Sequence, residues 1–209
     1  MELSHTLPAF TALLLAVGVM RLAEMSVSRR RQRALRARGV ARVDEPHFRL
    51  MVLLHTGVLV GAGLEAWLTR RPAIPALAAA ALVVVLAANA LRLWVIATLG
   101  PHWNVQIMDS APIGVVSTGP FRYVRHPNYV AVFLELAALP LVHSAFVTAA
   151  LGSALHVWVL AQRIRHEEAA LLAHPAYRAA MADKPRFFPR WGRGAGAGRS
   201  ANQAPGGPR

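Results

Sequence analysis

The polar stretch from Gly119 to Tyr129 holds the densest group of side chains in this sequence that are suited to binding. It reads GPFRYVRHPNY, and Pro127 fits the first turn of a helix because proline loses no hydrogen bond there. The free N–H groups of a helix start attract anions, and Arg125 and His126 lie directly before this one. The spacing therefore predicts an anion site at the start of a helix.

A second polar segment, RIRHEE from Arg163 to Glu168, ends in two adjacent carboxylates. Because it follows an apolar run, we expect Glu167 and Glu168 to lie where a helix leaves the membrane, at the depth of Arg125 and His126. An anion site that faces two carboxylates suits a zwitterionic cofactor with a carboxylate and ribose hydroxyls. Taken singly, the first motif also fits an interfacial anchor, and the second also fits a solvated helix face.

Three ionisable residues, His55, Glu65 and Glu135, interrupt apolar segments. Charged groups are costly in lipid, so such residues are functional candidates. Glu135 follows Asn128 by seven positions, which places both on one helical face about two turns apart. Glu135 is therefore a candidate catalytic base that points into the cofactor cavity. The alternative is a helix–helix contact, for which His55 is the candidate partner.

Several familiar site patterns are absent from the sequence. Zero cysteines exclude thiolate ligands and a cysteine nucleophile. The sequence HEEAA from His166 lacks the second histidine of a zinc-binding H-E-x-x-H motif. The glycines from Gly194 to Gly198 neither follow a strand nor open a helix. We therefore predict no metal site and no soluble dinucleotide-binding fold.

These polar segments are set in an apolar and basic chain. Of its 209 residues, 55% are hydrophobic, and the formal net charge is +13. The apolar residues form long runs with few charges, which indicates lipid as their surroundings. The arginines cluster between and after these runs, so no nucleic-acid partner is expected. The predicted fold class is all-α, a polytopic membrane protein with about five transmembrane helices and a cofactor pocket at its cytoplasmic interface.

The apolar runs, and the residues that interrupt them, predict the individual spans. The stretch Gly100–His126 is rich in glycine, proline and polar residues and is too irregular for the lipid interior. The last two spans should form a helical hairpin that turns near Pro140 and His143, and helix should continue past the membrane to Leu172. The predicted spans are Leu7–Leu22, Phe48–Leu68, Ile74–Leu99, Asn128–Val142 and Ser144–Gln162.

Arginines crowded into a polar loop from Arg29 to Arg42 predict the orientation of the chain. Such charges stay on the cytoplasmic side, which places the N-terminus outside and the C-terminus in the cytoplasm. We expect residues 1–191 to form one integral membrane domain. Residues 192–209, rich in Gly, Ala and Arg, are expected to be a disordered tail.

Several short motifs occur in the order typical of one family. They are LRLW from Leu91, LGPHWN from Leu99, Gly114, GPFRYVRHPNY from Gly119, Arg163, EExxL from Glu167, Tyr177 and FP from Phe188. Across residues 88–189 the sequence resembles the isoprenylcysteine carboxyl methyltransferase family, as a bacterial member. The resemblance implies a methyltransferase domain in the bacterial inner membrane, in which an R-H-P-x-Y segment and an E-E pair enclose S-adenosylmethionine (SAM).

The resemblance also implies roles for individual positions. SAM would contact the first segment on one side and the acidic pair on the other, with weaker matches in the loop before them. Arg163 would lie toward the substrate, as one of two catalytic candidates, the other being Glu135. The implied cofactor-binding residues are Gln106, Val116, Arg125, His126, Pro127, Asn128, Tyr129, Glu167 and Glu168.

The methyl acceptor is expected to be a hydrophobic or lipid-like molecule, modified on oxygen. A carboxylate acceptor needs no base, whereas a phenolic hydroxyl needs one. Val130 stands where eukaryotic members have glycine, and Phe121 where tyrosine is common, which weakens the match to a prenylated cysteine. With Glu135 near the motif, a hydrophobic small molecule is favoured over a protein C-terminus, and the modified oxygen is either a carboxyl, as in an isoprenylcysteine-type acceptor, or a phenolic hydroxyl, as in an alkylated polyketide. The alternatives are a phospholipid N-methyltransferase and a small transporter or structural membrane protein with His55, Glu65 and Glu135 as its polar path.

Overall fold

The chain folds into a bundle of helices joined by short connections, apart from one long irregular segment between α3 and α4. The structure, a computed structural model, describes residues 3–189. The predicted tail 192–209 lies outside the described residues. The α-helices are α1 (Leu3–Arg36), α2 (Phe48–Thr69), α3 (Pro75–Leu99), α4 (Pro127–Ala138), α5 (Phe146–Leu171) and α6 (Pro175–Met181). Single turns of 3₁₀ helix are η1 (Gly100–His102), η2 (Ala111–Ile113), η3 (Gly119–Arg122) and η4 (Pro140–His143).

Four of these helices, α1, α2, α3 and α5, are long and apolar enough to cross a membrane. The predicted fourth span is shorter than expected: α4 has 12 residues, about 18 Å against a hydrocarbon core of about 30 Å. It ends before Pro140, which has no N–H to continue the helix, and η4 follows. The all-α polytopic membrane fold is thus confirmed, as four long helices and one shorter apolar helix.

The arginine-rich segment is helical as far as Arg36, so its prediction as a loop was wrong up to that residue and holds only for Arg38 and Arg42. α1 continues to Arg36 and has 34 residues, about 51 Å in length, so it extends well beyond the hydrocarbon core. Arginine is a good helix former, so positive charge ends the lipid-embedded part of α1 without ending the helix. The true loop is confined to residues 37–47.

The outer surface of the bundle is apolar, and its interior contains small residues. Ala62, Ala66 and Ala88 are almost fully buried, which lets neighbouring helices approach closely, as is common in membrane proteins. Large apolar side chains face outward instead, where lipid would cover them. They include Leu15, Val19, Leu22, Leu53, Val60, Leu64, Leu68, Val83, Leu86, Leu93 and Leu151.

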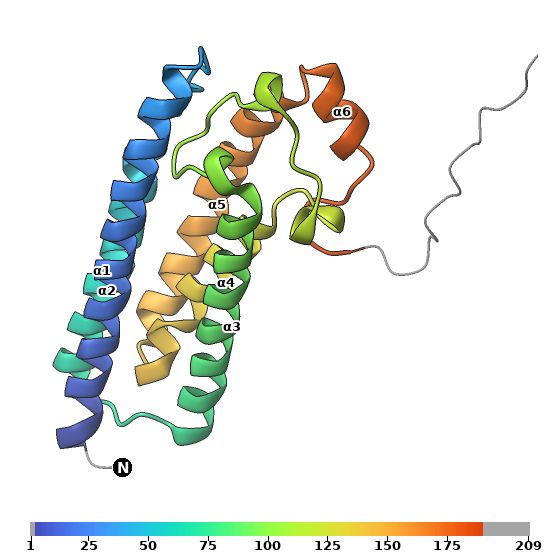
Figure 1. The fold of residues 1–209 in the computed structure, drawn as a ribbon. Helices are drawn as coiled ribbons and strands as arrows, with labels where there is room; N and C mark the ends of the chain where they lie inside the picture. Colours follow the sequence, from blue (N-terminus) through green and yellow to red (C-terminus); the bar gives the residue numbers. More distant parts are fainter. Residues whose placement is uncertain (1–2, 190–209) are drawn as a thin grey trace, which may run out of the picture.

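The irregular segments gather at one end of the bundle. Figure 1 shows the loop after α1, the long segment between α3 and α4, and α6 together at the end where α1, α3 and α5 finish. The turn between α2 and α3 lies at the opposite end, near the N-terminus. The polar residues singled out in the sequence therefore share the arginine-rich end.

Buried charges of opposite sign tie α1, α3 and α4 together. Glu135 Oε2 pairs with Arg21 Nη2 at 2.9 Å, and Glu24 Oε2 accepts both Arg21 Nη1 and Arg92 Nη2 at 2.6 Å. Asn89 Oδ1 accepts a further hydrogen bond from Arg21 at 3.0 Å. Of the two alternatives for Glu135, the structure therefore has the helix–helix contact, with Arg21 rather than His55 as the partner.

The two other ionisable residues have separate partners. The side chain of Glu65 accepts the N–H groups of Val147 and Thr148 at 3.1 and 2.8 Å, which caps the first turn of α5. His55 Nδ1 donates to the carbonyl of Met51 at 2.7 Å, and its ring lies edge-on to that of His156, with 5.2 Å between ring centroids. Each of these two residues thus has its own structural contact, and neither contact requires a polar path shared with Glu135.

The ion pair between Glu135 and Arg21 yields a stability prediction. Glu135→Ala leaves the Arg21 guanidinium with Glu24 and Asn89 but without this carboxylate, so we expect a loss of about 1–3 kcal/mol in the free energy of unfolding. Glu135→Gln keeps a hydrogen-bond acceptor and should cost less. Arg71→Gln, at a more exposed pair, is the control and should cost about 1 kcal/mol or less. Thermal unfolding in detergent measures this, and equal effects of Glu135→Ala and Arg71→Gln would contradict it.

Candidate active site

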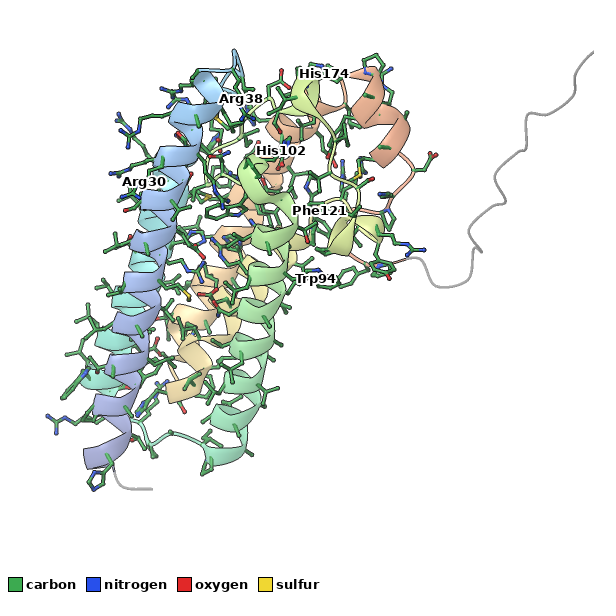
Figure 2. The ribbon with its side chains drawn as sticks, in the orientation of Figure 1. Arg30, Arg38, Trp94, His102, Phe121 and His174 are labelled. Carbon is green, nitrogen blue, oxygen red and sulfur yellow. The ribbon has the colours of Figure 1, made fainter. Side chains whose placement is uncertain are left out.

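A pocket opens at the arginine-rich end, between the long segment that follows α3 and the starts or ends of α4, α5 and α6. Its empty volume, including the part open to solvent, is about 870 Å³. Figure 2 shows His102 and Phe121, which line it, at the same end of the bundle as Arg30 and Arg38. Polar lining residues are His102, Asn104, Gln106, Ser110, Arg125, His126, Asn128, Tyr129, Arg163, Glu167 and Tyr177.

The turn that leads into α4 forms one wall of this pocket. Pro127 occupies the first turn of α4, as the sequence predicts. The backbone N–H groups of Arg125 and His126 donate to the carbonyls of Pro185 and Arg186, both at 2.9 Å. The segment after α6 therefore fixes the backbone of this turn, which leaves the side chains free to face the pocket.

Gly119 allows the same segment to lie against α3. Its φ is +55°, and a Cβ at this position would lie only 2.6 Å from the Thr98 hydroxyl oxygen. Glycine has no Cβ and tolerates positive φ. Any other residue would push η3, and with it Phe121, away from α3.

The two residues of the acidic pair, Glu167 and Glu168, lie in different places and have different contacts. Glu167 lines the pocket and accepts the hydroxyl of Tyr129. Glu168 is outside the lining and is buried behind it, where Oε1 contacts His126 Nε2 at 3.0 Å and Arg125 Nη1 at 3.3 Å. Its prediction as a direct cofactor contact does not match this geometry, because consecutive residues of a helix point about 100° apart. Glu168 holds the side chains that face the pocket.

A hydrogen-bonded guanidinium, that of Arg163, forms the inner corner of the pocket. Its Nε donates to the Tyr129 hydroxyl and its Nη1 pairs with Glu45 Oε2, both at 2.9 Å. Nη2 donates to the Val105 carbonyl, and Nη1 also contacts the sulfur of Met51 at 3.1 Å. Sequence reasoning missed Glu45, because it lies in a loop remote from the recognised motifs.

The loop from Ala37 to His47 also holds the pocket-lining segment directly. Val43 N–H donates to the Ile107 carbonyl at 3.0 Å, and Asp109 N–H donates to the Ala41 carbonyl at 2.9 Å. These bonds flank an antiparallel bridge between Arg42 and Met108. The α1–α2 loop therefore acts as a strap over one side of the pocket, a contact that no local pattern in the sequence predicts.

Several polar atoms in the lining have no hydrogen-bond partner among the described residues. They are Arg125 Nε, Trp103 Nε1 and Asn104 Oδ1, all of them buried. Buried polar groups are almost always paired, so unpaired ones in a pocket wall indicate a polar ligand. Burial, with the nearby Glu167 carboxylate, raises the pKa of Tyr177 above its usual range, so its hydroxyl stays protonated and can donate. The set offers donors on Arg125, Trp103 and Tyr177 and one acceptor on Asn104, which fits a ligand with both kinds of polar group.

Most of the site residues predicted from the sequence share this one lining. The structure places Gln106, Val116, Arg125, His126, Pro127, Asn128, Tyr129, Arg163 and Glu167 in it. Glu168 lies behind it, and Glu135 lies in the bundle with Arg21. Arg92 connects the two regions, since it pairs with Glu24 and donates to Asn128 Oδ1 at 3.4 Å.

Comparison with known proteins identifies the family. Residues 80–173, from α3 to just past α5, match the isoprenylcysteine carboxyl methyltransferase (ICMT) family. The chain is 32% identical to the uncharacterized protein YpbQ of Bacillus subtilis over 163 residues, which is 78% of this chain and 96% of that protein. It is 30% identical to an uncharacterized protein of Haemophilus influenzae over 72% of this chain and 88% of that protein. The chain thus belongs to the isoprenylcysteine carboxyl methyltransferase family, a family of membrane methyltransferases.

Proposed function

We propose that this protein is a SAM-dependent methyltransferase that methylates an oxygen atom of a hydrophobic or lipid-like acceptor. The observation that carries the proposal is the pocket at the end of a membrane bundle, whose lining brings Arg125 and His126 together with Glu167. Its unpaired buried polar atoms support a polar ligand. Its place at the end of lipid-facing helices would serve a soluble cofactor and a lipid-borne acceptor together.

The lining residues match the functional groups of SAM. Arg125 carries an unpaired Nε and would hold the carboxylate of the cofactor, because arginine binds carboxylates well. Glu167 lies beside His126, with 3.9 Å between Nδ1 and Oε2, and its carboxylate would hold the ammonium group or the ribose hydroxyls. When bound, SAM supplies a methyl group on a positively charged sulfur. Glu168 would act indirectly, since it holds His126 and Arg125.

The chain itself mainly has to align the reactants and exclude water. Transfer of a methyl group needs proximity and orientation more than covalent help. Tyr129, Arg163 and Glu167 form one connected hydrogen-bonded set in the pocket wall, which would keep that wall rigid. We do not assign the role of a base to Glu135, because its carboxylate pairs with Arg21 outside the pocket lining.

We further propose that the pocket faces the cytoplasm of a bacterial cell. The arginines from Arg29 to Arg42 lie at the same end of the bundle as the pocket. Dense positive charge stays on the cytoplasmic side of the inner membrane. The N-terminus would then lie outside and α6 inside the cell.

Loss of the Arg125 side chain should weaken cofactor binding. Arg125→Ala removes a charge-assisted contact, so we expect the Kd for SAM to rise about tenfold or more. Arg122→Ala removes an exposed arginine of the same segment that lies outside the pocket lining, and it should leave the Kd unchanged. Titration calorimetry in detergent measures both.

The outcome that contradicts the cofactor assignment is equal SAM binding by wild type and Arg125→Ala. A labelled methyl donor, followed by lipid extraction, then distinguishes the acceptor. Label on an amine head group would contradict O-methylation and would indicate phospholipid N-methylation instead.

The orientation has a direct test, because the chain contains no cysteine. We expect Ala73→Cys, in the turn between α2 and α3, to react with a membrane-impermeant maleimide in intact spheroplasts. Ala37→Cys, in the strap, should react only after the membrane is permeabilised. The reverse pattern would show that the pocket faces outward.

A further inference from the structure

Exposed aromatic side chains lie on two short segments beside the end of α3, residues 119–126 and 184–188. Tyr123, directly after η3, is 53% exposed, and Phe188, after α6, is 77% exposed. Neither segment is part of a helix that could cross the membrane. Large exposed rings outside the membrane spans mark a surface that a membrane or another molecule covers.

Hydrogen bonds join these two segments into one platform. The backbone N–H groups of Arg125 and His126 donate to carbonyl groups of the second segment, both at 2.9 Å. In the other direction, Lys184 Nζ donates to the Phe121 carbonyl at 2.7 Å. These polar groups are thus paired within the platform, as irregular backbone close to lipid requires.

Contacts with α3 fix the depth of the platform. Gly119 lies against Thr98, because a Cβ on this glycine would be 2.6 Å from the Thr98 hydroxyl oxygen. Thr98 in turn lies one helical turn beyond Trp94 on the same face of α3, and its hydroxyl donates to the Trp94 carbonyl at 2.8 Å. Figure 2 shows Phe121, which belongs to the platform, on the same side of α3 as Trp94.

Trp94 marks the level of the membrane–water interface. It is 51% exposed, next to Leu93, which is 61% exposed on the lipid-facing surface of the bundle. Tryptophan on the outside of a transmembrane helix is typical of the interface. The platform begins about one turn, or about 5 Å, beyond this level, which places it among the lipid head groups.

The platform also carries positive charge beside its exposed rings. Arg122 precedes Tyr123, is exposed, and forms no side-chain hydrogen bond or ion pair with any residue that the structure describes. Arg186 precedes Phe188 by two positions and pairs with Glu168, yet its side chain remains 53% exposed. An anionic group outside the chain can therefore pair with Arg122 without displacing an existing partner.

An anionic phospholipid meets both of these requirements at once. Its phosphate lies at the head-group level, where the arginines are, and its acyl chains begin just below, where exposed rings are stable. The platform also continues the lipid-facing surface of α3 through Trp94. This continuity favours lipid over a soluble acidic protein.

We infer that the platform binds the head groups of anionic phospholipids at the membrane interface. Arg122 pairs with the phosphate, while Tyr123 and Phe188 lie against the first part of the acyl chains. Phe121, on the inner side of the platform, lines the pocket, so bound lipid would hold one wall of the pocket against the bundle. The inference makes no use of SAM, and it stands or falls separately from the proposed methyltransferase function.

A fluorescent label can measure the depth of the platform, because the chain has no cysteine of its own. The protein is placed in vesicles of phosphatidylcholine and phosphatidylglycerol, with an environment-sensitive NBD label on Phe188→Cys. We expect emission at shorter wavelength than in water, and quenching by lipids that carry a nitroxide near the head group. The matched control is Ala176→Cys, exposed on α6, where the label should emit as in water.

Two results of this measurement would overturn the inference. A label at position 188 that emits as in water would show that the platform lies above the membrane. Emission at short wavelength without quenching by the nitroxide lipids would show that a protein or a second copy of the chain covers the platform instead.

The preference for anionic lipid is measured with the same label at position 188. We expect nitroxide-labelled phosphatidylglycerol to give half-maximal quenching at about one fifth of the concentration needed for phosphatidylcholine, as one arginine near an anionic head group predicts. Adding Arg122→Gln should remove most of this fivefold difference. Arg178→Gln, which removes an exposed arginine of α6, should leave it unchanged. Equal quenching by the two lipids, or a full preference in Arg122→Gln, would contradict the inference.

Discussion

The site depends on one guanidinium, that of Arg163, whose contacts join parts of the chain that are remote in sequence. It binds Tyr129 on α4, Val105 in the pocket-lining segment, and Glu45 in the strap. Arginine suits this position because it keeps its charge when buried and directs several donors in one plane. Without it, the pocket would lose part of its wall, and α4, α5 and the strap would lose their shared contact.

The membrane imposes a second constraint, which accounts for the charges inside the bundle. A charged side chain in lipid is stable only with a partner or a polar cavity. Arg21, Glu24, Arg92 and Glu135 satisfy one another across three helices. Arg92 also reaches Asn128 at the start of α4, so this network fixes the depth at which the pocket-lining turn meets the bundle.

The part of the chain that matches the family, residues 80–173, supplies most of the pocket lining but not the parts that complete it. The strap pairs with residues 107–109, and the segment after α6 holds the turn before α4. Both lie outside the matched range. The matched range therefore supplies the core of the site, and the flanking sequence supplies its two outer supports.

The sequence alone determined the membrane helices, the irregular segment between them and the residues that meet in the pocket, because apolar runs, proline positions and ordered motifs are local signals. It did not determine how Glu167 and Glu168 divide their tasks, which partner Glu135 has, or that Glu45 belongs to the site. α1 also extends further than predicted, because arginine marks the limit of the lipid-embedded part but not the end of the helix. These features depend on side chains that meet only when α1, α4, α5 and the strap pack together. Long-range contacts of this kind leave no periodic trace in the sequence, so only the tertiary structure decided them.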